Sequence, residues 1–231
     1  MSRSHQAAVL YAALGAVHVA GAVAHGDLVD DLTKPLLMPL LALYAVAAHR
    51  ERGARVSRRL LLSLAFAWAG DVTLQIGGTV ALIAGMLLFA VAYGIYAVEF
   101  IRTGAFRLRR RWLHLTGYAA VAAGALAWLW PGLSERGVAW PMAGYAGLMA
   151  VMAASATSWG WRVGAGGGLL LASDALIGVG LAETVDLPGR AALVMATYLL
   201  GQALVVAGWA ARAPRREPAR PASRPADLAS A

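Results

Sequence analysis

The amino-acid sequence predicts an all-α polytopic membrane protein with eight transmembrane helices and both termini in the cytoplasm. Its 231 residues are 60% hydrophobic and only 14% charged, whereas about a quarter of the residues in a soluble domain are charged. Several uncharged runs approach the ~20 residues that a helix needs to cross the hydrocarbon core. The Lys and Arg residues gather in alternate connecting segments, which is the pattern of a multi-span protein.

Composition also excludes several functional classes. The chain has no cysteine, which excludes a disulfide framework, thiolate metal sites and thiol nucleophiles. Its formal net charge is +8, but the arginines lie between long apolar stretches rather than on one soluble face. We therefore expect no nucleic-acid partner.

Uncharged runs of sequence define the spans. The six runs without Asp, Glu, Lys or Arg cover residues 4–26, 35–49, 72–98, 112–134, 137–161 and 191–211. Two further spans, residues 60–76 and 163–182, are expected if each is allowed one aspartate, Asp71 or Asp174. The glycine pair 77–78 then forms the tight turn between the third and fourth spans. An even number of spans places both termini on one side.

The basic residues test this count independently. If the N-terminus is cytoplasmic, 17 of the 20 Lys and Arg residues lie inside, and only Lys34, Arg136 and Arg190 lie outside. Lys and Arg residues that flank spans determine orientation in this way. The apolar run before residues 22–24 also resembles a signal peptide, but it is long for one, so we expect an uncleaved first span.

The chain divides into an integral membrane helical domain, residues 1–211, and a basic Pro/Ala/Arg cytoplasmic tail, residues 212–231. The tail has too few apolar residues to order itself, so we expect it to be disordered. Residues 1–104 and 112–211 are possible parallel four-helix repeats, because the third span of each carries one aspartate. Chance similarity between Ala- and Leu-rich helices is the alternative.

Two membrane-embedded acids are the strongest functional signal. Asp71 lies twelve residues after Arg59, and Asp174 lies twelve residues after Arg162, which puts both about 18 Å from the cytoplasmic side at about 1.5 Å per residue. Such a residue costs roughly 2.5–3.5 kcal/mol and usually faces a cavity or a partner. The pair predicts one polar pocket that holds a protonated acid and an ionised base. Two separate structural hydrogen bonds are the alternative.

Further polar residues lie in or beside the spans. Lys34, the only lysine, stands at the outer mouth of the second span, where it either snorkels or offers a compact cation to a phosphate or an aspartate. Tyrosine and glutamine side chains form two pairs that share a helix face, and each of them has packing as the alternative role. The pairs are Tyr93 with Tyr96 and Tyr198 with Gln202.

Short motifs along the chain share their order and spacing with one known family. They are Thr33-Lys34-Pro35-Leu36 followed by Met38, Ala69-Gly70-Asp71, the segment from Phe89 to Tyr96, Ser173-Asp174, and Tyr198 with Gly201-Gln202. In these residues the chain resembles the YhhN family of lysoplasmalogenases, which are eight-span membrane proteins. One departure is Tyr93, which stands where the family commonly has a histidine.

The resemblance implies hydrolysis of the vinyl ether of a lysoplasmalogen to a fatty aldehyde and a glycerophospho-ethanolamine or -choline. Asp71 and Asp174 would be the catalytic pair, with charge development like that in a glycosidase with two carboxyls, so neither a metal nor another cofactor is expected. Lys34 would hold the phosphate. The residues expected to orient water and the ether oxygen are Tyr93, Tyr96, Tyr198 and Gln202.

These observations predict an ether hydrolase of the lysoplasmalogenase type in a bacterial inner membrane, with a lysophospholipid substrate and membrane lipids as partners. Two other classes of function stay open. Parallel repeats with acids near the midplane also describe a small-molecule or proton-coupled transporter. A non-catalytic membrane scaffold would use the acids only to join helices. The headgroup preference, the division of labour between the two acids and the oligomeric state are left open.

Overall fold

The computed structural model describes residues 1–24, 27–102 and 111–213 of the chain, and the predicted tail, residues 212–231, lies almost entirely outside this part. Within it, helices and short turns account for the whole backbone and no strand is present, so the predicted all-α class is confirmed. The elements are α1 (Arg3–Val23), α2 (Asp27–Glu51), α3 (Arg58–Gln75), α4 (Gly78–Arg102), α5 (Arg111–Glu135), α6 (Ala139–Ala156), the 3₁₀ turn η2 (Thr157–Trp159), α7 (Trp161–Ala182) and α8 (Arg190–Arg212).

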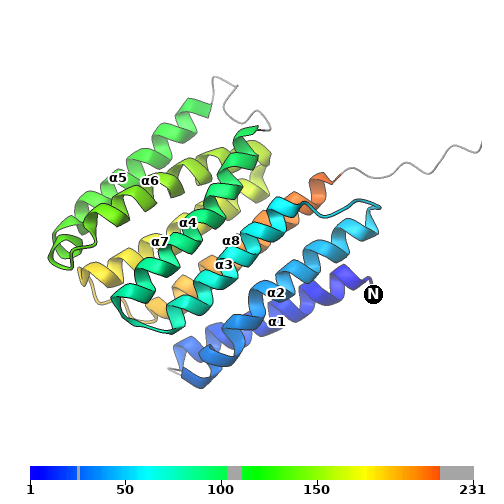
Figure 1. Cartoon of the computed structure of the whole chain (residues 1–231), viewed down its shortest axis with the longest axis horizontal. Helices are drawn as coiled ribbons and strands as arrows, with labels where there is room; N and C mark the ends of the chain where they lie inside the picture. Colours follow the sequence, from blue (N-terminus) through cyan, green and yellow to red (C-terminus); the bar gives the residue numbers. More distant parts are fainter. Residues whose placement is uncertain (25–26, 103–110, 214–231) are drawn as a thin grey trace, which may run out of the picture.

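Successive helices run up and down in one bundle (Figure 1). The N-terminus and the last turn of α8 lie at the same end, which we call the proximal end. The opposite end, where α1, α3, α5 and α7 finish, is the distal end. Most helices adjacent in sequence pack together, except that α4 packs against α6 rather than α5, and α8 also contacts α1 and α2, which closes the bundle between its first and last helices.

Six of the described helices are long and apolar enough to cross a membrane, as expected of an integral membrane protein. They are α1, α2, α4, α5, α7 and α8. The other two, α3 and α6, have 18 residues each, or about 27 Å at 1.5 Å per residue, and α3 also carries Arg58 and Arg59 at its start. The eight-span topology, the cytoplasmic termini and the repeat remain predictions.

Glycine makes the predicted turn between α3 and α4. Gly77 and Gly78 have φ angles of 77° and 83°, in the region that an L side chain rarely adopts. The turn therefore lies at the predicted place. It brings α4 back against α3, where Gly85 admits the side chain of Leu74: a Cβ at position 85 would lie 2.7 Å from that leucine.

Two prolines lie inside α2, in its first half. Proline has no N–H, so Pro39 leaves the carbonyl of Pro35 without its usual partner one turn later. The indole Nε1 of Trp68 on α3 donates to that carbonyl at 2.9 Å. This bond holds α2 against α3. On α2 its acceptor follows Lys34 directly, and on α3 its donor, Trp68, lies three residues before Asp71.

Small residues let α7 and α8 approach closely. A Cβ on Gly166 would lie 2.8 Å from the carbonyl oxygen of Gly201, and a Cβ on Gly201 would lie 3.0 Å from that of Gly166. Close approach of small residues is a common way for membrane helices to pack. Gly201 lies one turn from Tyr198, so the contact also determines where α8 presents its polar side chains.

Candidate functional site

Asp71 is enclosed at the junction of α3, α4 and α8. It lies thirteen residues after Arg58, the first residue of α3, and is only 3% exposed. The hydroxyl of Tyr198 on α8 donates a hydrogen bond of 2.8 Å to its carboxyl group. Gly70 lets the ring of Phe89 lie against α3, because a Cβ there would be 2.8 Å from that ring.

Asp174 has a different environment on the other side of the bundle. It lies thirteen residues after Trp161, the first residue of α7, so the two acids occupy the same position along their helices. The hydroxyl of Tyr145 on α6 donates to it at 3.0 Å. Asp174 and Tyr145 line a cavity of about 50 Å³ between α5, α6 and α7, which Asp71 does not line. A water molecule, which occupies about 30 Å³ in the liquid, fits such a space.

Tyr93 on α4 lies between the two acids. Both Asp71 and Asp174 act electrostatically on its hydroxyl. The side chain is fully buried, and its hydroxyl has no hydrogen-bond partner among the residues that the structure describes. The Tyr93 ring lies 6.4 Å from the ring of Tyr145. Tyr93 therefore places one unpaired polar group between the carboxyl groups.

The two carboxyl groups are within electrostatic range of each other, but each has its own tyrosine partner. Asp174 lines the small cavity between α5, α6 and α7 and Asp71 does not, so one pocket shared by both acids remains a prediction, while each acid does have a separate hydrogen bond, as in the alternative. Two carboxyl groups with phenol donors can exchange protons in a site from which bulk water is excluded.

One member of each predicted pair, Tyr96 and Gln202, forms a new pair between α4 and α8 toward the proximal end. The hydroxyl of Tyr96 donates to Oε1 of Gln202 at 3.0 Å, and both residues are fully buried. Nε2 of Gln202 finds no partner within the described chain. Gln202 is four residues from Tyr198 on α8, so the two lie on one helix face. The Tyr96–Gln202 pair thus adjoins the Asp71 side of the site.

Lys34 lies at the distal opening. It lines a cavity of about 610 Å³ between the distal ends of α1, α2, α7 and α8, together with Asp30, Asp31 and Arg190. Its charge acts on Asp71, although the lysine is not within ion-pair distance of any described acid. Lys34 therefore stands between the distal opening and the buried acid.

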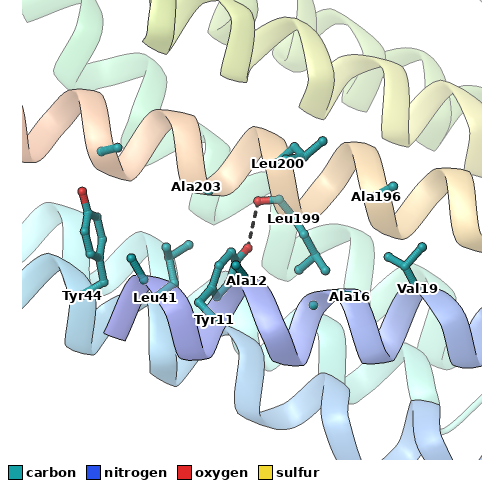
Figure 2. A pocket seen from close by; sticks show the side chains of 13 residues that line it. Tyr11, Ala12, Ala16, Val19, Leu41, Tyr44, Ala196, Leu199, Leu200 and Ala203 are labelled. Atoms are coloured by element: carbon teal, nitrogen blue, oxygen red, sulfur yellow. Dashed lines mark hydrogen bonds between the residues drawn. The ribbon is translucent and has the colours of Figure 1, made fainter. Parts of the chain in front are cut away.

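An apolar groove of about 460 Å³ runs between α1 and α8 (Figure 2). Figure 2 shows Tyr11 of α1 reaching across it to α8, where its hydroxyl donates to the carbonyl oxygen of Leu199 at 2.8 Å. Ala12, Ala16 and Ala196 leave the groove wide. Tyr11 is also within electrostatic range of Asp71, so the groove passes close to that acid.

Sequence reasoning missed four polar residues of this region. Tyr11 and Tyr145 carry no local signal, because their partners belong to other helices. Arg190 and Asp30 lie at or near the first residues of α8 and α2, where sequence reasoning expected ordinary charged connections. Only the fold brings Asp30 and Arg190 to one cavity and Tyr145 to another.

The described residues contain no group of three His, Asp or Glu side chains that could hold a metal ion. The site therefore consists of carboxyl, phenol, amide and amine groups.

The bundle of long apolar helices, with one buried and one half-buried acid in its interior, is typical of an integral membrane protein with a polar site between its helices. A family model narrows the class, because the model of the YhhN family matches residues 29–209. The chain belongs to the YhhN family. The matched residues include both acids, Lys34 and the three tyrosines predicted from sequence, while α1 lies outside them.

Searches of curated proteins and of solved structures found no match to the chain.

Proposed function

We propose that this protein is an integral membrane hydrolase that cleaves the vinyl ether bond of lysoplasmalogens. The products are a fatty aldehyde and a glycerophospho-headgroup. One observation carries the proposal: a buried acid, Asp71, and a half-buried acid, Asp174, at the same position along α3 and α7 have separate tyrosine donors and act electrostatically on each other. Membership of the YhhN family is consistent with a membrane enzyme.

The location of Asp71 favours it as the proton donor. Lys34 and Tyr11 are both within electrostatic range of Asp71, so a lipid with its phosphate at Lys34 and its chain in the α1/α8 groove presents the ether to Asp71. The protonated carboxyl transfers its proton to the vinyl carbon that is not bonded to oxygen. The C=C electron pair forms the new C–H bond, and the adjacent carbon becomes an oxocarbenium ion.

Asp174 acts as the base in the second step. Its ionised carboxylate takes a proton from a water molecule drawn from the cavity beside Tyr145, and the water oxygen adds to the oxocarbenium carbon. The product is a hemiacetal, which collapses to the aldehyde and the free glycerol hydroxyl. At the end Asp174 carries a proton and Asp71 is ionised, so the net change is addition of one water.

The remaining polar groups position these reactants. Tyr198 and Tyr145 donate to the ionised forms of Asp71 and Asp174, and charge-assisted bonds of this kind are stronger than neutral ones. The unpaired Tyr93 hydroxyl provides a path by which the proton returns from Asp174 to Asp71. Tyr96 and Gln202 orient the ether oxygen from the proximal side.

The charge distribution suggests how the enzyme lies in the membrane. With the N-terminus in the cytoplasm of a bacterial cell, the distal cavity opens on the outer side of the inner membrane. A lysophospholipid from the outer leaflet then enters with its headgroup at Lys34.

Purified full-length protein incubated with a lysoplasmalogen tests the proposal. We expect aldehyde release that is lost in Asp71→Asn and in Asp174→Asn but retained in Asp186→Asn, an exposed acid at the distal end. Thermal unfolding of each variant in the same detergent controls for loss of structure. Uptake of the lipid into sealed vesicles without aldehyde would contradict the hydrolase and favour a transporter.

A further inference from the structure

The distal cavity carries charges of both signs that the hydrolytic chemistry does not use. Asp30 and Asp31 belong to α2, and Arg190 belongs to the start of α8. Together with Lys34 they place two acids and two bases around about 610 Å³. A cavity with two acidic and two basic side chains is complementary to a zwitterion rather than to a simple anion or cation.

The two basic groups are not paired with the neighbouring acids. Neither Lys34 nor Arg190 makes an ion pair with any residue of the described chain. Two other arginines of the described chain do have acidic partners, Arg59 with Glu99 and Arg136 with Glu183. Two unpaired cations at one opening are a suitable receptor for a phosphate.

The Arg190 guanidinium lies directly over a glycine of α7. A Cβ on Gly180 would lie 0.8 Å from Nη1 of Arg190. Any side chain at position 180 would therefore displace the guanidinium from this location. Gly180 provides the space in which Arg190 reaches the cavity.

The acids, in contrast, are fixed by uncharged or buried neighbours. Nε2 of His18 lies 3.1 Å from Oδ1 of Asp30, and His18 is itself fully buried and 2.7 Å from the hydroxyl of Thr33 through Nδ1. The side-chain amide of Gln75 on α3 donates to Asp31 at 3.4 Å. The two carboxylates are thus positioned at the cavity without being neutralised by Lys34 or Arg190.

We propose that this cavity binds the phosphoethanolamine headgroup of a lysophospholipid, with the phosphate at Lys34 and Arg190 and the primary ammonium at Asp30 and Asp31. The identification of the lipid as a substrate rests on the proposed hydrolase. A primary ammonium donates three hydrogen bonds to carboxylates, whereas a quaternary ammonium is recognised by aromatic rings. Among the residues that the structure describes, none that lines the cavity is aromatic, which disfavours choline.

The apolar groove continues from this cavity along the same two helices. On α8 the lining passes from Val194 and Met195 in the cavity to Ala196 and Leu199 in the groove. Figure 2 shows Val19 of α1 and Ala196 of α8 at the same end of the groove. The cavity and the groove are thus neighbours along α1 and α8, so a lipid with its headgroup in the cavity can place its single alkyl chain in the apolar groove.

Binding of saturated alkyl ether lysolipids to the purified full-length protein tests this proposal, because these probes have no vinyl ether to hydrolyse. We expect the ethanolamine probe to bind about tenfold more tightly than the choline probe, a difference of about 1.4 kcal/mol. Asp31→Asn and Asp30→Asn should each reduce this preference. Arg190→Gln and Gly180→Ala should weaken the binding of both probes. Arg136→Gln, on an exposed arginine at the same end, is the matched control.

Equal or tighter binding of the choline probe by the unmodified protein would overturn the proposal, as would an unchanged preference in both aspartate variants. Soluble glycerophosphoethanolamine should bind at least tenfold more weakly, since it lacks the chain that fills the groove. Equal affinity for this soluble compound would contradict a lipid as the source of the headgroup. If the protein preferred the ethanolamine probe but did not hydrolyse lysoplasmalogen, the headgroup site would be supported and the proposed hydrolase activity would be wrong.

Discussion

Asp71 and Asp174 occupy the same position along their helices and each accepts from a tyrosine, but the helices and cavities around them differ. Asp71 is bonded to α8 and lies within electrostatic range of Lys34 and of Tyr11 beside the groove. Asp174 is bonded to α6 and faces a small cavity away from the groove. The position of each acid along its helix follows from the sequence, whereas the neighbouring helices determine which groups the acid contacts and what chemistry it can perform.

The tyrosine donors also separate the two acids. In a strict four-helix repeat, a bond from α3 to α8 would be matched by one from α7 to α4, but Asp174 is instead bonded to Tyr145 on α6. The two acids therefore share a position along their helices but accept hydrogen bonds from helices that the repeat would not relate to each other. We interpret the asymmetry as a division of labour in which Asp71 faces the lipid and Asp174 faces the water.

The largest expected effect comes from removing either acid. Asp71→Asn and Asp174→Asn should each lower kcat/KM for a lysoplasmalogen by about 10²–10⁴-fold, the usual contribution of a general acid or base. Aldehyde release under steady-state conditions measures the effect. If one of the two variants kept more than a tenth of the activity, the two-acid mechanism would be wrong.

Removing the tyrosine hydroxyls should lower the activity to different extents on the Asp71 side and on the Asp174 side of the site. Tyr198→Phe should lower kcat about 10–100-fold, because loss of a hydrogen bond to a buried charged group costs about 1.5–3 kcal/mol. Tyr145→Phe should have a smaller effect, since a water in the adjoining cavity can replace its hydroxyl. Parallel measurements of kcat and KM on both variants check the order, and the reverse order would contradict the assignment of sides.

Lys34→Gln should affect substrate binding rather than the chemical step. A charge-assisted bond to phosphate contributes about 1.5–3 kcal/mol, so KM should rise about tenfold or more with little change in kcat. Initial rates over a range of lysoplasmalogen concentrations separate the two constants. A fall in kcat at constant KM would instead place Lys34 in proton transfer.

Tyr93→Phe should have the smallest effect on activity and leave stability intact. A single neutral hydrogen bond is worth about 0.5–1.5 kcal/mol, so kcat should fall about two- to tenfold as proton return slows. The variant should unfold at the same or a higher temperature, because it removes a buried hydroxyl without a partner. A lowered unfolding temperature with unchanged kcat would reduce Tyr93 to a packing residue.

The all-α class and the helical segments could be predicted from the sequence because their causes are local. Uncharged runs marked six of the helices, and the glycine pair at 77–78 marked a turn whose positive φ angles require glycine. The matching position of Asp71 and Asp174 along α3 and α7 also followed from counting residues along a helix.

The contacts between distant helices could not be predicted in the same way. Tyr11 bonds to Leu199, 188 residues away, and Tyr145 looks like any tyrosine of an apolar span. In a membrane, hydrophobicity does not tell a lipid-facing surface from a helix interface, since both are apolar. Arg190 joins Lys34 only because α8 packs beside α1 and α2.

Hydrolysis in heavy water provides the most direct test of the mechanism. The purified protein is incubated with a lysoplasmalogen in heavy water, the aldehyde is reduced as it forms, and the product is analysed by mass spectrometry. Proton delivery to the vinyl carbon predicts one deuterium on the carbon next to the former carbonyl, and no such product from Asp71→Asn. Product without deuterium at that carbon, or no aldehyde from the unmodified protein, would contradict the account.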